Sequence, residues 1–320
     1  MKRGILFALC LALLLGMGGC AAPDEGAGGF RVLCTNFPLY DWVRELTDGV
    51  SDVEATLLVG NGADLHSYQP TVADVASIQE CDLLVYIGGE SDAWVAEALA
   101  AAEGSPRAMA MLPYLDGHLM EEHEDHDHGG ETEYDEHVWL SLRNAQLCVR
   151  ALAQALAQAL PEAETQLTAN ADRYCGALAA LDAGTAAAVK RAPVRTVLFA
   201  DRFPFLYWME DYGLHYNAAF PGCSAETEAG FDTVVRLADT LRGERLPAIL
   251  VLEGNDGRLA ATLQETAGVR VPVLELHSMQ SVTREQAEKG ASYLAYMERN
   301  CQTLLQALGA EEGRDSYGSD

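Results

Sequence analysis

The stretch PEAETQLTANADRYCGALAALDAGTAAAVKRAP, residues 161–193, lies in the middle of the chain and decides how the rest can be arranged. It is rich in Ala, Leu, Glu and Gln, poor in strand-forming residues, and has a proline at each end. Pro161 can begin a helix and Pro193 must end one, so we expect one long helix of about 45 Å at roughly 1.5 Å per residue. Two shorter helices, broken near Gly176 or Gly184, are the alternative.

Short apolar runs alternate with helical patterns on both sides of this stretch. The runs that predict strands before it are RVLCTNF (31–37), EATLLVG (54–60), CDLLVYIGG (81–89) and RAMAML (107–112). Those after it are TVLFA (196–200), LHYNAAF (214–220), AILVLEG (248–254) and VPVLELHS (271–278). Strands that alternate with helices predict parallel sheets with helices on both faces. We therefore expect two similar α/β lobes joined by the long helix, whose stiffness allows only small lobe movements.

The first twenty residues are typical of a secretory signal. Lys2 and Arg3 precede an apolar run from Gly4 to about Met17, and small residues then lead to Cys20. This run is shorter than the roughly 20 apolar residues of a membrane-spanning helix. Because it ends in Gly-Gly-Cys, it resembles a bacterial lipoprotein signal in which Cys20 is lipidated; an ordinary secretory signal is the alternative. We expect an extracytoplasmic protein anchored to the cell membrane.

Composition narrows the classes of function. The formal net charge of -27 disfavours nucleic acid as a partner. Six cysteines follow Cys20 without a CxxC pair, so both disulfides and scattered buried thiols are possible.

The predicted segments are the signal peptide 1–20, a flexible tether 21–29, the N-terminal lobe 30–160 with a His-rich loop 118–134, the linker helix 161–193, the C-terminal lobe 194–309 and a disordered tail 310–320.

Two histidines occupy positions where a ligand site is expected. Ligands of parallel sheets gather outside the carboxyl ends of strands, and with two lobes the natural site is the cleft between them. His66, in GADLHSYQPTVADV, follows the second predicted strand. His137, in DEHVWLSLRNA, lies between Glu136 and an amphipathic helix. Each histidine taken alone is ambiguous, because a lone histidine is often only a polar surface residue.

Together these segments resemble a known family. TNFPLYDWVRELTDG, ADLHSYQPTVADVASIQECDLLVYIGG, DEHVWLSLRNA and SYLAYMERN are similar to the zinc and manganese ABC-transporter solute-binding lipoproteins, of the metal-binding cluster A-I type. The similarity covers nearly the whole chain after the signal. It implies two α/β lobes joined by a long helix, and it implies that His66 and His137 are metal ligands.

The second lobe departs from the family pattern. The third ligand position, in LFADRFPFLYW, is occupied by Ala200, which cannot bind metal. Asp201 beside it is a substitute candidate, or else a carboxylate paired with Arg202 or capping the next turn. His277, in LELHSM, stands where the resemblance places an aspartate ligand, and a cleft or surface histidine is the alternative. Glu253, in VLEGND, is a reserve ligand or a structural acid.

The ligand set His66, His137, Asp201 and His277 indicates the metal. Neutral imidazoles favour a borderline ion such as Zn²⁺ over Ca²⁺ or Mg²⁺, and Mn²⁺ prefers more oxygen ligands. We therefore expect Zn²⁺, with Mn²⁺ as the alternative.

A second group of histidines lies in HLMEEHEDHDHGGETEYDEH, which is acidic and has no apolar period. This segment predicts a mobile loop that gathers metal loosely, or a solvated loop without a role. Its auxiliary metal-collecting residues are His118, His123, His126 and His128.

The resemblance implies a monomer that captures Zn²⁺ and passes it to an ABC transporter permease, without a chemical reaction. A manganese or iron binder of the same family stays open, and so does a surface adhesin with a structural metal. A zinc hydrolase is the least favoured reading, because the sequence contains no HExxH and no GxSxG motif.

Overall fold

The computed structural model describes residues 29–60, 62, 65–102, 106–121, 134–220, 222 and 229–310. The elements of the first half are β1 (Phe30–Cys34), α2 (Phe37–Leu46), β2 (Val53–Leu57), α3 (Val72–Glu80), β3 (Leu83–Tyr86), α4 (Trp94–Ala101), β4 (Arg107–Ala110) and α5 (Leu142–Ala159). Those of the second half are α6 (Glu164–Val189), β5 (Thr196–Phe199), α7 (Leu206–Tyr212), β6 (His215–Ala218), α8 (Phe231–Gly243), β7 (Ile249–Leu252), α9 (Arg258–Ala267), β8 (Val273–Leu276), α10 (Arg284–Glu288) and α11 (Tyr293–Ala307).

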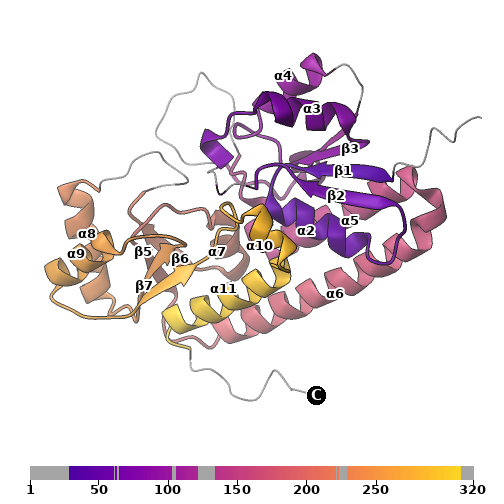
Figure 1. Cartoon of the computed structure of the whole chain (residues 1–320). Helices are drawn as coiled ribbons and strands as arrows, with labels where there is room; N and C mark the ends of the chain where they lie inside the picture. Colours follow the sequence, from indigo (N-terminus) through magenta and orange to yellow (C-terminus); the bar gives the residue numbers. More distant parts are fainter. Residues whose placement is uncertain are drawn as a thin grey trace, which may run out of the picture.

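The two sheets have the same topology. The strand orders are β2-β1-β3-β4 and β6-β5-β7-β8, and every pairing is parallel. Helices flank both sheets, which lie in separate lobes (Figure 1). The predicted pair of α/β lobes is thereby confirmed. Because parallel strands need crossover connections, both lobes collect their strand-end loops at one edge of the sheet.

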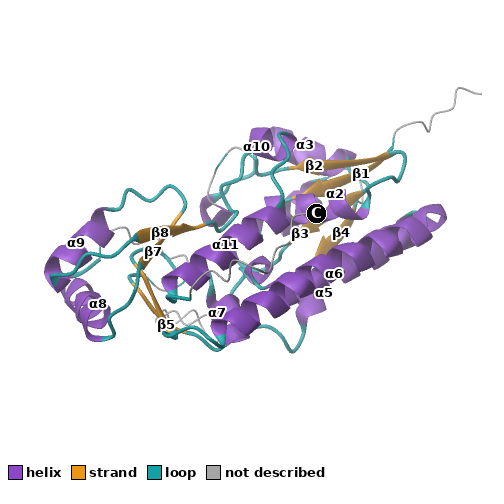
Figure 2. Ribbon diagram, turned by 90° about the horizontal axis from the view of Figure 1, so that it is seen from below, coloured by secondary structure: helices purple, strands orange, loops and turns teal. Residues whose placement is uncertain are grey.

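The predicted long central helix is confirmed as one continuous element, which is shorter at both ends than the predicted range 161–193. Pro161–Ala163 forms a short 3-10 turn, α6 then runs for 26 residues, and the chain leaves the helix before Pro193. At roughly 1.5 Å per residue this helix is about 39 Å long. Neither Gly176 nor Gly184 breaks it. It packs along α5 and α2 and also contacts α11, so it is supported along its length (Figure 2).

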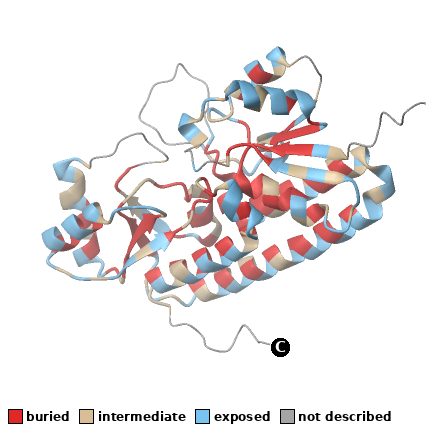
Figure 3. Cartoon of the chain, in the orientation of Figure 1, coloured by how far each residue is buried: buried red, intermediate tan, exposed pale blue. Residues whose placement is uncertain are grey.

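Each sheet has an inner face and an outer face. Val85 of β3 and Phe199 of β5 belong to the same large apolar cluster, so the inner faces contribute to one continuous core. Their chain neighbours Leu84 and Leu198 point the other way, because side chains alternate along a strand. Leu84 packs in a small cluster with α3 and α4, and Leu198 in another with α8 and α9. The central strands β3, β5 and β7 are correspondingly buried (Figure 3), whereas the edge strands β2, β4, β6 and β8 keep exposed or half-buried residues.

The last helix, α11, ties the end of the chain to the first lobe. The Tyr293 N–H at its start donates to Asp41 Oδ2 at 2.7 Å, and the Tyr293 ring meets Trp42 edge-on at 5.2 Å. Asp41 is buried, and burial raises the pKa of its carboxyl to about 6, although the Tyr293 N–H and Arg44 act in the opposite direction.

The structure also bears on the cysteines and on the question of a membrane-spanning helix. Cys34, Cys81, Cys148, Cys175 and Cys301 are buried free thiols. Within the described ranges, no helix combines the length and apolar character needed to cross a bilayer. The predicted signal peptide 1–20 lies outside the described residues, as do the predicted tether 21–29 and the predicted tail 310–320 except for Gly29 and Ala310.

The buried Asp41 carboxyl predicts a pH-dependent stability. The pKa of Asp41 is higher in the folded chain, at about 6, than the ordinary value of 3.8. The carboxyl therefore contributes its full share to the free energy of unfolding below about pH 4, and this share is lost as pH rises through 6. Asp41→Asn should remove this loss. The difference in unfolding free energy between wild type and variant should change across that window by up to about 3 kcal/mol, in favour of the variant at higher pH. Urea unfolding at several pH values measures it, with exposed Asp48→Asn as control; parallel curves for wild type and Asp41→Asn would contradict the assignment.

Candidate metal centre

His137 is held in place by the residue two positions before it. Its backbone N–H donates to Asp135 Oδ1 at 2.7 Å, and its ring Nδ1 lies 3.0 Å from the same oxygen. Both side chains are buried. A carboxylate only accepts hydrogen bonds, so the neutral ring carries its proton on Nδ1 and leaves the Nε2 lone pair for a metal or a donor. The ring plane is therefore fixed before any ligand arrives.

His66 approaches this nitrogen from another loop. It lies on a short 3-10 turn, Leu65–Ser67, after β2, and its side chain is exposed. His66 Nε2 is 3.2 Å from His137 Nε2, and His66 Nδ1 is 2.7 Å from Ser91 Oγ. The sequence-predicted pair is thus brought together although 71 residues separate its members.

The loop between β3 and α4 completes the surroundings of the pair. The Ser91 N–H donates to Glu136 Oε1 at 2.9 Å, so this loop is bonded to the residue beside His137. Gly89 has φ +87°, and a Cβ there would lie 2.3 Å from Glu136 Oε1. Asp92 Oδ2 accepts the N–H groups of Ile87 and Gly88, and burial raises its pKa to about 6.

A small pocket of about 10 Å³ lies between these segments, and its lining includes His66, Ser91, Glu136 and Trp139. That volume suits a ligand the size of a water molecule or an ion.

Asp201 is a structural carboxylate in this arrangement. Its Oδ2 accepts the Leu252 N–H at 3.0 Å and the Asn255 side-chain amide at 2.6 Å, and its Oδ1 accepts the Arg202 N–H at 2.8 Å. These bonds join the ends of β5 and β7. Ala200 before it is fully buried in the outer C-lobe cluster. Asp201 therefore lies at the predicted strand end, with both oxygens engaged by protein donors.

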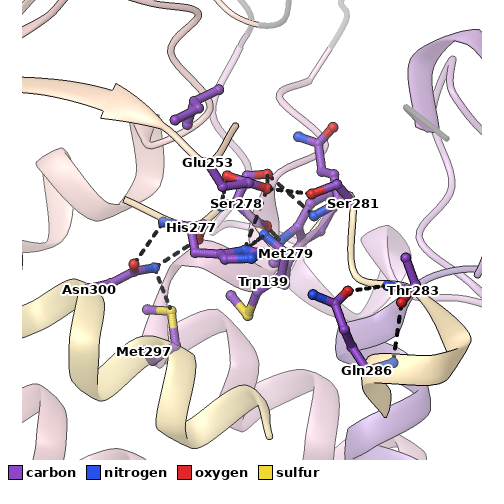
Figure 4. Close-up of polar contacts among 12 residues, drawn as sticks. Trp139, Glu253, His277, Ser278, Met279, Ser281, Thr283, Gln286, Met297 and Asn300 are labelled. Carbon is purple, nitrogen blue, oxygen red and sulfur yellow. Dashed lines mark hydrogen bonds and ion pairs between the residues drawn. The ribbon is translucent and has the colours of Figure 1, made fainter. Parts of the chain in front are cut away.

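His277 and Glu253 lie next to each other at the ends of β8 and β7 (Figure 4). His277 Nδ1 accepts the Met279 N–H at 2.9 Å and is 3.5 Å from Glu253 Oε1. Burial lowers the pKa of the His277 imidazole, against the opposing effect of Glu253. Glu253 accepts from the Ser278 N–H, the Ser278 hydroxyl and the Ser281 hydroxyl, at 2.7–3.0 Å. The predicted reserve ligand thus shapes the loop after β8.

Trp139 joins the two groups of residues. Its ring lies against His137, with centroids 5.3 Å apart, and its Nε1–H donates to the Ser278 carbonyl at 2.8 Å. The Tyr293 hydroxyl donates to the Trp139 carbonyl at 2.6 Å. Ser278, the residue after His277, is therefore hydrogen-bonded directly to the segment that carries His137.

The structure thus brings together His66 and His137, and it places Asp201, Glu253 and His277 at strand ends of the other lobe. In the described part of the chain, no group of three or more His, Cys, Asp or Glu side chains is arranged to hold a metal ion. Of the predicted collecting residues, His118 follows a short 3-10 turn, Leu112–Leu115. His123, His126, His128 and the predicted lipidation site Cys20 lie outside the described residues.

Sequence reasoning missed Ser91 as the partner of His66, and Glu136 as the partner of the Ser91 backbone. The signal that could have revealed them is the Gly-Gly pair one residue after β3, because two glycines at a strand end indicate a tight loop at the ligand edge of the sheet.

The chain is similar in sequence to known zinc-uptake proteins. The family model described as zinc-uptake complex component A, periplasmic, matches residues 32–307. Zinc-binding lipoprotein AdcA of Streptococcus pneumoniae serotype 4 is 29% identical over 314 residues, which cover 96% of this chain and 61% of AdcA. High-affinity zinc uptake system protein ZnuA of Bacillus subtilis is 26% identical over 313 residues, covering 95% of this chain and 96% of ZnuA. The chain thus spans about three fifths of the AdcA length.

Solved structures agree in fold. The Zn(II)-bound ZnuA-like domain of Streptococcus pneumoniae AdcA matches with a TM-score of 0.70 and 27% identity, over 88% of this chain and 99% of that one. The periplasmic zinc binding protein TroA of Treponema pallidum matches with a TM-score of 0.73 at 24% identity, over 88% and 99%, and supports the fold alone. The fold is that of a two-lobed α/β protein, and the histidine pair lies where loops of the first lobe meet. By the extent of the family match, the chain belongs to the zinc-uptake complex component A family.

The contact between Gly89 and Glu136 predicts a specific effect of a methyl group. Gly89→Ala combines strain at positive φ with a clash against Glu136, so it should lower the free energy of unfolding by about 2–4 kcal/mol. Gly117→Ala is the matched control, because Gly117 has φ +78° and open space around its Cβ position. Urea unfolding compares the two variants. Equal destabilisation would show that the packing against Glu136 contributes nothing.

Proposed function

We propose that this chain is the extracytoplasmic solute-binding component of a metal ABC importer, which captures Zn²⁺ between its two lobes and delivers it to the permease. The observation that carries the proposal is the convergence of His66 Nε2 and His137 Nε2 at 3.2 Å. Two neutral imidazole nitrogens aimed at one point form a good partial site for a borderline ion. The family match and the zinc-binding names of the relatives support the same function.

The role needs binding and release, and no bond of a substrate has to be broken. Asp135 fixes the His137 ring, and Trp139 covers one side of it. These contacts orient a metal ligand and limit access of water. A solute-binding protein without enzymatic activity accounts for each of them.

The C-lobe ligands are proposed as His277 and Asp201. In the described arrangement each has protein partners, namely the Met279 N–H for His277 and three N–H groups for Asp201. Loading therefore requires these groups to exchange protein hydrogen bonds for the metal. His277 has the smaller exchange to make, because only Nδ1 is engaged by a backbone donor. Glu253, with three donors, is the reserve.

The His-rich loop is proposed to collect metal for this site. Its base is defined by a bridge between Glu121 and Tyr134 and by the Asp135 N–H, which donates to the Met120 carbonyl. The Tyr207 hydroxyl accepts from the Met120 N–H and donates to the Asp135 carbonyl. Metal gathered by the loop would be released directly beside the residue that orients His137.

Location, assembly and segment boundaries complete the proposal. We propose that lipidated Cys20 anchors the protein, as a monomer, to the outer side of the cell membrane. We further propose lobes at 30–160 and 194–309, joined by the linker 161–193. The name of AdcA as a lipoprotein supports the anchor.

Zinc calorimetry on the metal-free chain tests the histidine pair. His66→Ala and His137→Ala should each weaken Zn²⁺ binding by at least about 100-fold, or about 2.8 kcal/mol, because each removes a coordinating nitrogen. His215→Ala is the matched control. His215 is exposed at the amino end of β6, whereas the proposed C-lobe ligands follow the carboxyl ends of their strands. Wild-type affinity in His137→Ala would refute the site. Titration with Mn²⁺ and a deletion of 118–130 complete the series.

The C-lobe ligand is assigned by a second series. His277→Ala should weaken Zn²⁺ binding by at least about tenfold, or about 1.4 kcal/mol, while the unfolding midpoint stays close to wild type. Asp201→Ala should lower the midpoint because it leaves three donors without their acceptor, two of them in part-buried hydrogen bonds. If His277→Ala binds normally and Asp201→Ala or Glu253→Ala does not, the ligand is reassigned to that carboxylate.

A further inference from the structure

The contacts of His66 contain a constraint on where its proton lies. His137 carries its proton on Nδ1, facing Asp135, so its Nε2 presents a lone pair. His66 Nε2 faces that lone pair at 3.2 Å. A hydrogen bond across this contact therefore takes its proton from His66 Nε2. The neutral His66 ring then has its own lone pair on Nδ1, where it accepts the Ser91 hydroxyl at 2.7 Å. The proton donors therefore run in one direction, from Ser91 through both rings to Asp135.

A metal held by both Nε2 atoms needs the opposite state of His66. Its Nε2 then binds the ion through a lone pair, so the proton of the neutral ring moves to Nδ1. The group facing Nδ1 must now accept a hydrogen bond. A serine hydroxyl does both, because it has one donor and two acceptor lone pairs.

We propose that Ser91 is the positioning residue that lets His66 change tautomer when metal binds, donating to Nδ1 in the empty site and accepting from Nδ1 in the loaded one. The inference rests on the proposed function, since it takes His66 as a metal ligand. The total number of protons on the two rings stays the same, because one proton leaves His66 Nε2 and one is held at Nδ1.

The loop that carries Ser91 is built to hold this hydroxyl still. The Ser91 N–H is bonded to Glu136, and Asp92 accepts two N–H groups of the same loop. Gly88 and Gly89 adopt positive φ values of 92° and 87° to form the turn. Rotation of the Ser91 O–H bond is then the only change that the switch requires of this residue.

Nitrogen NMR on the full chain, labelled with ¹⁵N-histidine, tests the tautomer directly. Spectra are recorded at about pH 8, above the ordinary histidine pKa of about 6.5, and His66→Gln identifies the signals. Without metal, His66 should show a protonated Nε2 and an unprotonated Nδ1; after Zn²⁺ addition Nδ1 should be protonated. His137 should keep its Nδ1 proton throughout. A His66 ring that already has its proton on Nδ1 in the metal-free chain, or that has both nitrogens protonated, overturns the inference.

Variants test the role of the hydroxyl. Ser91→Ala should shift the His66 Nδ1 signal in the metal-free chain and weaken Zn²⁺ binding by roughly 10-fold or more, as expected for a residue that orients a ligand. Ser91→Thr keeps the hydroxyl and should restore both to near wild type. Ser77→Ala is the control, because Ser77 has an exposed hydroxyl on α3 that bonds only locally. An unchanged Nδ1 signal and affinity in Ser91→Ala overturn the proposal.

The failure of this inference is distinguishable from that of the proposed function. If Zn²⁺ shifts the Nε2 signals of His66 and His137 but Nδ1 of His66 gains no proton, the metal site holds and the Ser91 switch is wrong. If Zn²⁺ leaves both rings unchanged, the proposed site is wrong and the loaded half of the switch is wrong with it.

Discussion

The hydrogen bonds from His137 to Asp135 are the constraint on which the rest of the site depends. One carboxylate oxygen accepts both the backbone N–H and the ring Nδ1–H, so the position, the plane and the tautomer of the ring are set together. The lone pair on Nε2 then dictates the state of His66, and His66 dictates how Ser91 must orient its hydroxyl. Without the Asp135 carboxylate, His137, His66 and Ser91 would all lose the contact that sets their orientation.

The candidate ligands of the two lobes differ in their present contacts. On the N-lobe side the paired nitrogens of His66 and His137 already face one another. On the C-lobe side the carboxylates at the strand ends serve the fold, since Asp201 joins β5 to β7 and Glu253 shapes the loop after β8. Trp139 connects the sides through its bond to the Ser278 carbonyl. Beneath both groups, the inner faces of the two sheets share one apolar core.

Much of this architecture follows from local sequence patterns. The alternation of apolar runs predicted both sheets, and the prolines at 161 and 193 bracketed the long helix, because strand and helix periodicity and proline geometry are local properties. The side-chain partners were beyond such reasoning. Asp201 was expected to be available at its strand end, but donors 51 and 54 residues further along the chain surround it. Ser91 meets Glu136 across 45 residues, a pairing that only the tertiary fold creates.

Metal affinity in such a site is a difference between two well-satisfied states. The His66 and His137 rings contact each other through their Nε2 atoms, and the His277 Nδ1 accepts a backbone donor. An ion must form bonds strong enough to replace these contacts. Borderline ions that favour nitrogen can do so, whereas Mg²⁺ and Ca²⁺ gain little from imidazole. The same contacts reform when the ion leaves, so the hydrogen bonds that oppose loading also favour release to a partner.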